Sequence, residues 1–108
     1  MKIWRLGIEI ATETYRIVKT FPDLERFDLS SQVNRCSISI TSNIAEGSAR
    51  TNKSFSHFLD VSLGSSFELG SQLVLAFNRS YIDEKIVIKI ETKLEEFQKM
   101  TMGFQKTL

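Results

Sequence analysis

The stretch from Asn43 to Ala76 most constrains what this chain can fold into, because a short polar turn leads into a long, almost chargeless helical pattern. Between Ser54 and Phe77 the only formal charges are Asp60 and Glu68, and His57 is the only imidazole. Apolar and small residues recur there at helical spacing, namely Phe55, Phe58, Leu59, Ser62, Ser66, Leu69, Leu73 and Ala76. This periodicity predicts a helix whose stripe faces the core.

Large apolar residues also occupy other sides of the same predicted helix: Val61, Phe67, Val74, Leu75 and Phe77. A one-sided amphipathic helix needs only one apolar stripe, with polar residues opposite it. We therefore expect this helix to be covered on two sides. Gly64 and Gly70 lie inside it, and each costs about 1 kcal/mol relative to Ala. Their presence predicts that a neighbouring helix approaches closely at both positions.

Length and composition indicate one globular domain spanning residues 1–108. Apolar residues make up 42% of the chain and charged residues 25%, both ordinary values for a folded protein, so we do not expect disorder. The apolar runs are too short to span a bilayer, and no charged-then-apolar leader opens the sequence. We therefore expect a cytoplasmic protein without a membrane partner.

The first half of the chain contains two further predicted helices. Ile3 to Thr20 is amphipathic, and Pro22 should end it. Ser31 to Glu46 is ambiguous, because its β-branched residues alternate like a strand, but its apolar residues also share one helical face over a length unusual for a strand. We favour a helix that begins at Ser30 or Ser31 and ends at Gly47 in the left-handed conformation, which Gly adopts without cost.

Capping residues mark the last two helices. Thr51 or Asn52 should start the third helix, which we expect to end near Asn78 to Ser80, and Asp83 should start the fourth. The fourth has the apolar stripe Ile86, Ile90, Leu94, Phe97, Met100 or Thr101, and Phe104, with a charged face opposite. Four helices with apolar faces and mostly short connections predict an all-α, antiparallel up-and-down four-helix bundle.

The inventory of reactive side chains argues against an enzyme. A carboxylate-bridged metal bundle needs paired Glu-x-x-His motifs, whereas His57 is the only histidine and Cys36 the only cysteine. No Gly-rich phosphate loop, Gly-x-Ser-x-Gly elbow or paired-cysteine zinc pattern occurs. We therefore predict no catalytic residue, no metal and no cofactor. Cys36 lies in an apolar helical row, which favours a buried core position.

Glu46 and Glu68 lie in apolar stretches, where an ionised group needs a partner. The structural interpretation is that they bond to neighbours such as Asn43, Arg50 or a helix end and fix the register of the bundle. The alternative is a small-ligand or enzymatic role centred on the turn that contains Asn43, Glu46 and Arg50.

A net charge of +1 is not the strongly basic balance of a dedicated nucleic-acid binder, which leaves a local basic patch as the way to contact phosphates. The sequence offers two groups of candidates: Arg35, Arg50, Lys53 and Arg79 around the central turn, and the row Lys85, Lys89 and Lys93. Such a row of lysines is usually a solvated face. Oligomerisation would repeat a weak patch and so strengthen it.

Several residues together resemble a known family: Ser31-Gln32, Arg35, Asn43-Ile44-Ala45-Glu46-Gly47, Arg50, Phe55, Phe58-Leu59, Gly64-Ser65, Glu68-Leu69, Gln72-Leu73 and Tyr81-Ile82. In these motifs, and in Trp4 of the first helix, the chain resembles the four-helix-bundle proteins named for the 23S rRNA intervening sequence. The resemblance implies a small bacterial bundle that assembles as a homopentamer. Related proteins act as accessory factors of diversity-generating retroelements, so it also implies RNA or a nucleoprotein as partner.

Overall fold

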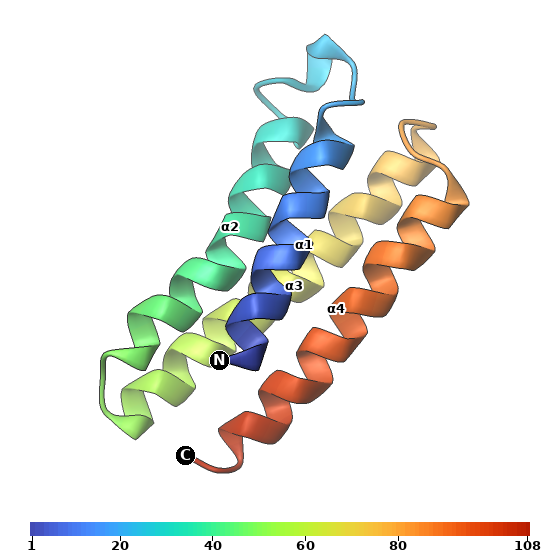
Figure 1. Cartoon of the computed structure of the whole chain (residues 1–108). Coiled ribbons are helices and arrows are strands. Elements are labelled where there is room, and N and C mark those ends of the chain that lie inside the picture. Colours follow the sequence, from blue (N-terminus) through green and yellow to red (C-terminus); the bar gives the residue numbers. More distant parts are fainter.

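The computed structural model describes all 108 residues as four α-helices and one short 3₁₀ turn (Figure 1). The elements are α1 (Lys2–Val18), η1 (Asp23–Glu25), α2 (Leu29–Ser48), α3 (Asn52–Asn78) and α4 (Glu84–Gln105). Successive helices run antiparallel, and each contacts its neighbours around the bundle: α1 packs on α2 and α4, and α3 packs on α2 and α4. The predicted all-α, antiparallel up-and-down four-helix bundle is confirmed.

The bundle has two distinct ends (Figure 1). The α1–α2 and α3–α4 connections lie at one end, which we call the connection end. The α2–α3 turn and both termini lie at the other, which we call the turn end. Because α3 has 27 residues and an α-helix rises 1.5 Å per residue, the two ends lie roughly 40 Å apart. Residues at the two ends of α3 therefore cannot form one site within a chain.

One continuous core of 21 buried apolar residues fills the bundle. The predicted core stripe of α3 is buried except for Phe58, which is half-buried, and Leu59, Leu69 and Leu73 are completely inaccessible to solvent. The ambiguous segment from Ser31 to Glu46 is helical, because Val33, Ile40 and Ile44 all point into this core.

The helix starts follow the sequence closely. The Thr51 hydroxyl accepts a hydrogen bond from the Ser54 amide at 3.3 Å, and the Asp83 carboxylate accepts one from the Ile86 amide at 2.9 Å. Both predicted caps are confirmed. The predicted cap of α2 at Ser30 or Ser31 is wrong, because the N-cap is Asp28, two or three residues earlier. The helix begins at Leu29, whose side chain is already buried in the core.

Gly47 does not end α2 in a left-handed conformation, so that prediction is wrong. It lies inside the helix, which continues to Ser48, and no glycine of the chain has a positive φ. A Cβ at Gly47 would lie 2.7 Å from the Cβ of Phe58 and 2.9 Å from Cδ1 of Phe55. Glycine is therefore required here because α2 and α3 approach closely at the turn end.

The predicted close approach at Gly64 and Gly70 is also wrong within the chain. A Cβ at Gly64 would meet nothing within 4 Å, and one at Gly70 would make an ordinary 3.8 Å contact with Leu94. The close approaches occur instead at Gly47 and at Gly7, where a Cβ would lie 2.9 Å from a methyl of Thr41. Sequence spacing alone does not distinguish a glycine on the outside of a helix from one at a helix crossing.

The Gly47 contact generates a stability prediction. Gly47→Ala should destabilise the fold by about 1–3 kcal/mol, because the Cβ of Phe58 belongs to the helix stem and cannot rotate away. Gly103→Ala is the matched control, since a Cβ there meets nothing within 4 Å. It should be neutral or stabilise by up to about 1 kcal/mol. Urea unfolding of both variants measures the effects, and equal changes of the same sign would contradict the close approach.

Candidate interaction surfaces

The outward side of α3 carries large apolar side chains that the chain leaves uncovered. Val61, Phe67, Val74, Leu75 and Phe77 are 39–56% exposed. Between Val61 and Asn78 the only charged residue is Glu68. We expected α3 to be covered on two sides, but the chain itself covers only one of them. We call these five residues the α3 face.

A second apolar surface lies along α1 and α2. Trp4, Ile8 and Tyr15 on α1 and Ile38 on α2 are 39–56% exposed, and we call them the α1–α2 face. Two hollows of about 430 and 320 Å³ follow it, the first beside Ile8, Tyr15 and Ile38 and the second beside Trp4. Thr14 lies in the buried stripe of α1, whereas the neighbouring Tyr15 points to the solvent. This face is not among the features predicted from the sequence, although Trp4, Ile8 and Tyr15 share one side of a helix.

Four of the seven candidate basic residues are engaged within the chain. Arg50 pairs with Glu46, and Arg79 donates to Glu25 at 2.8 Å. Lys89 and Lys93 both reach Glu13, at 3.6 and 2.7 Å. Arg35, Lys53 and Lys85 have no ion pair within 4.0 Å. The candidate set is therefore a mixture of neutralised and unpaired cations.

The predicted solvated row of lysines is only partly solvated. Lys93 is about one-quarter exposed and bridges α4 to Glu13 of α1. Burial opposes ionisation of Glu13, but the hydrogen bond and charge of Lys93, together with the charge of Lys89, outweigh it and lower the pKa of Glu13. These two lysines therefore help to join the first and last helices, whereas Lys85 stays exposed.

The structure does not gather the candidate cations into one patch. Arg50 and Lys53 lie at the turn end, beside the start of α3. Arg79 and Lys85 lie at the connection end, beside the other end of α3. Arg35 lies two turns into α2, nearer the connection end. The first predicted group, centred on the turn, is thus spread along the whole length of the bundle.

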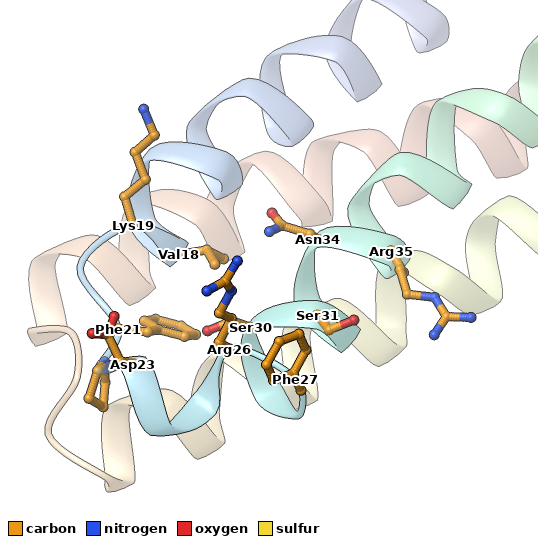
Figure 2. A pocket seen from close by; sticks show the side chains of 11 residues that line it. Val18, Lys19, Phe21, Asp23, Arg26, Phe27, Ser30, Ser31, Asn34 and Arg35 are labelled. Carbon is orange, nitrogen blue, oxygen red and sulfur yellow. The ribbon is translucent and has the colours of Figure 1, made fainter.

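The connection end contains an open groove of about 510 Å³ between the end of α1, η1 and the start of α2 (Figure 2). Its cations are Lys19, Arg26 and Arg35, and its only carboxylate is Asp23. We call it the connection groove. Of these three cations, the sequence predicts only Arg35 as a contact, and Lys19 and Arg26 are not among the candidates. Their spacing across a loop has no helical period, so only the path of η1 reveals that the three share a groove.

Glu25 holds this end of the bundle together. The residue is 4% exposed, and its carboxylate accepts hydrogen bonds from the Tyr81 hydroxyl at 2.6 Å and from Arg79 at 2.8 Å. The Tyr81 hydrogen bond is the main influence that lowers the pKa of Glu25; burial opposes it and the Arg79 charge adds to it. The same bond raises the pKa of Tyr81. Glu25 thereby ties η1 to the α3–α4 connection.

The family-motif residues Asn43, Glu46, Gly47 and Glu68 do not converge on one point. Asn43 donates to the Ser39 carbonyl at 2.8 Å, and Gln72 donates to Glu68 at 3.3 Å. Glu46 and Glu68 are exposed on the surface, so the expectation of carboxylates in apolar surroundings is wrong. The bond from Arg50 to Glu46 agrees with the structural interpretation.

The other reactive side chains have structural surroundings. Cys36 is buried, as predicted, and its thiol donates to the Ser65 carbonyl at 3.0 Å. Burial, with the nearby Glu68 charge, raises the pKa of Cys36 to about 11. His57 stacks edge-on against Phe58. Nowhere do three His, Cys, Asp or Glu side chains gather as a metal site requires, and none of the helices has the length and apolarity to cross a membrane.

Fold and surface together define a class: a small four-helix bundle with two uncovered apolar faces and a basic groove. The family model for the 23S rRNA-intervening sequence protein matches residues 1–103. The chain belongs to this family, which confirms the resemblance seen in its motifs.

A solved structure has the same fold. It is a protein of unknown function from the S23 ribosomal protein family of Bacteroides thetaiotaomicron. It is 23% identical to this chain, with a TM-score of 0.88 over 96% of this chain and 98% of that one. A comparison with curated proteins finds no match.

The Glu25 contacts predict a pH effect. Because the folded-state pKa of Glu25 is lowered, its contribution to stability is present above the pKa of the unfolded chain and is lost as the pH falls through the folded pKa. Glu25→Gln should lower the urea midpoint near pH 7 and narrow the difference between the midpoints near pH 7 and pH 3. Glu96→Gln, at an exposed carboxylate without an ion pair, is the control and should leave that difference as in the wild type. An unchanged difference in Glu25→Gln would contradict the assigned role.

Proposed function

We propose that this protein is a non-catalytic, homo-oligomeric module that assembles through its α1–α2 face and its α3 face and engages RNA or a nucleoprotein partner. The single observation that carries the proposal is the pair of unlike apolar faces on one small chain. Monomeric proteins rarely expose apolar patches larger than a few hundred Å². A face with almost no charge, such as that of α3, also lacks the charged residues that keep a free surface soluble.

The positions of the two faces indicate how copies join. α1 packs on α2 and α4 and does not pack on α3, so the two faces lie on different sides of the bundle. A two-fold interface uses the same patch on both copies, whereas a head-to-tail interface joins two different patches and forms a ring when the rotation between copies closes. We therefore propose that the α3 face of one copy packs on the α1–α2 face of the next. The family resemblance implies that the ring is a pentamer.

The surroundings of the polar side chains support a role without catalysis. Glu46 and Arg50, the centre of the alternative ligand-binding hypothesis, neutralise each other on the surface. Asn43, the third member of that hypothesis, donates its amide to Ser39 on its own helix. The Cys36 thiol is held protonated by burial. The family name supports RNA as the partner, and a ring would repeat each chain's unpaired cations around its axis.

The assembly is tested by single substitutions on each face. Phe67→Asp on the α3 face and Ile38→Asp on the α1–α2 face, both at side chains 56% exposed, should each reduce the solution mass to that of one chain without loss of helicity. Ile88→Asp is the matched control, because Ile88 is 53% exposed on α4, outside both faces. Light scattering after gel filtration, with circular dichroism, measures mass and helicity. A monomeric wild type at micromolar concentration would refute the proposal.

Mixing the two variants tests the head-to-tail geometry. Each variant keeps one intact face, so an equimolar mixture should form a dimer from the intact α3 face of Ile38→Asp and the intact α1–α2 face of Phe67→Asp. Such a dimer cannot grow, because its remaining faces both carry the substitution. If each face instead paired with its own copy across a two-fold axis, each variant alone would already form a dimer. That result would overturn the head-to-tail arrangement while leaving self-assembly standing.

A further inference from the structure

We infer that the connection groove binds single-stranded nucleic acid, with Lys19, Arg26 and Arg35 on backbone phosphates and Phe27 stacked on a base. This inference rests on the proposed function in naming nucleic acid as the partner. It goes further by assigning the site and the strand form. The observations that carry it are a groove of stated size, its unpaired charge and an aromatic ring at its edge.

The cations of the groove have no carboxylate partner. None of Lys19, Arg26 and Arg35 has an ion pair within 4.0 Å, although Asp23 also lines the groove. The buried Glu25 carboxylate is occupied by Arg79 and Tyr81 and so does not neutralise them. Three unpaired cations within one groove favour an anion with several negative groups along its length, as in a phosphate backbone.

The arrangement of the cations spans the groove (Figure 2). Lys19 extends from the end of α1 at one side, Arg35 extends from α2 at the other, and Arg26 reaches into the opening between the two helices. Ser30, Ser31 and Asn34 line the α2 wall and add hydroxyl and amide groups. These neutral groups can hydrogen-bond phosphate oxygens or ribose hydroxyls without adding charge.

Phe27 distinguishes a nucleic acid from a simple anion. Its side chain is 88% exposed, the most exposed large apolar residue of the chain, although it also lines the groove. The Arg26 guanidinium lies 5.2 Å from the centre of its ring. Base stacking on exposed aromatic rings next to a cationic groove is how proteins hold single strands without reading sequence. A duplex keeps its bases stacked inside and offers no base to Phe27, so a single strand is favoured.

Binding is measured by fluorescence anisotropy with a labelled oligouridylate of about eight nucleotides, within the site sizes known for such grooves. For three phosphate contacts, log K against log salt should fall with a slope of about −2, since each contact on a single strand contributes about −0.7. The matching deoxy-oligonucleotide and an RNA duplex are run in parallel. If the RNA oligonucleotide binds more tightly than its deoxy counterpart, the groove recognises the ribose. If the two bind equally, the groove accepts single-stranded RNA and single-stranded DNA alike. Duplex binding as tight as the single strand would overturn the inference.

Two variants separate charge from stacking. Arg35→Gln should reduce the magnitude of the salt slope by about 0.7. Phe27→Ala should weaken binding about 5- to 100-fold at every salt concentration and leave the slope unchanged. Lys53→Gln is the control, because Lys53 is an exposed, unpaired cation at the turn end, far from the groove. It should bind as the wild type does.

Measuring mass alongside affinity keeps the two proposals separate. A ring that binds no single strand would overturn the groove assignment and leave the assembly intact. A monomer that binds through Arg35 and Phe27 would refute the assembly and support the groove. If Lys53→Gln weakened binding and Arg35→Gln left it unchanged, the contacts would lie at the turn end and the inference would be overturned. Binding of a polyglutamate peptide with the same affinity in the wild type and in Phe27→Ala would also overturn the inference, because it would indicate an acidic protein partner.

Discussion

The close packing of α2 against α3 is the constraint on which the rest of the structure depends. Small side chains tie the two helices together: Ser62 donates to the Ile40 carbonyl at 2.7 Å, and Ser65 donates to the Ser39 hydroxyl at 2.9 Å. Gly47 lets the helices meet at the turn end without a Cβ between them. With two long helices held in this register, α1 packs on α2, α4 packs on α3, and the two meet each other to complete the core.

α3 also carries large apolar side chains that the chain itself leaves uncovered. The large apolar residues of α3 divide between the core and the solvent. Leu69 and Leu73 are completely buried, whereas Phe67 and Leu75 remain about half exposed. A bundle of this length has only one core, so the second apolar side of α3 can be covered only by another molecule.

Ion pairs divide the basic side chains of the surface into those with a carboxylate partner and those without one. Glu13 and Glu25 each engage the basic side chains near them and join elements distant in sequence, the first α1 to α4 and the second η1 to the α3–α4 connection. The three cations of the connection groove are left without a carboxylate partner, as is Lys85 nearby at the same end. A net charge near zero therefore coexists with a locally basic groove, because Asp23 is the only carboxylate that lines it.

Local periodicity, capping chemistry and short motifs are enough to predict the helical class, the caps at Thr51 and Asp83, the core stripe of α3 and the family. Three features follow only from how the helices pack: the requirement for glycine at position 47, the pairing of individual cations, and the groove shared by Lys19, Arg26 and Arg35. The reason is physical. Periodicity determines which side of a helix is apolar, but the neighbour that covers that side and the carboxylate that meets a given cation depend on how the helices cross in space.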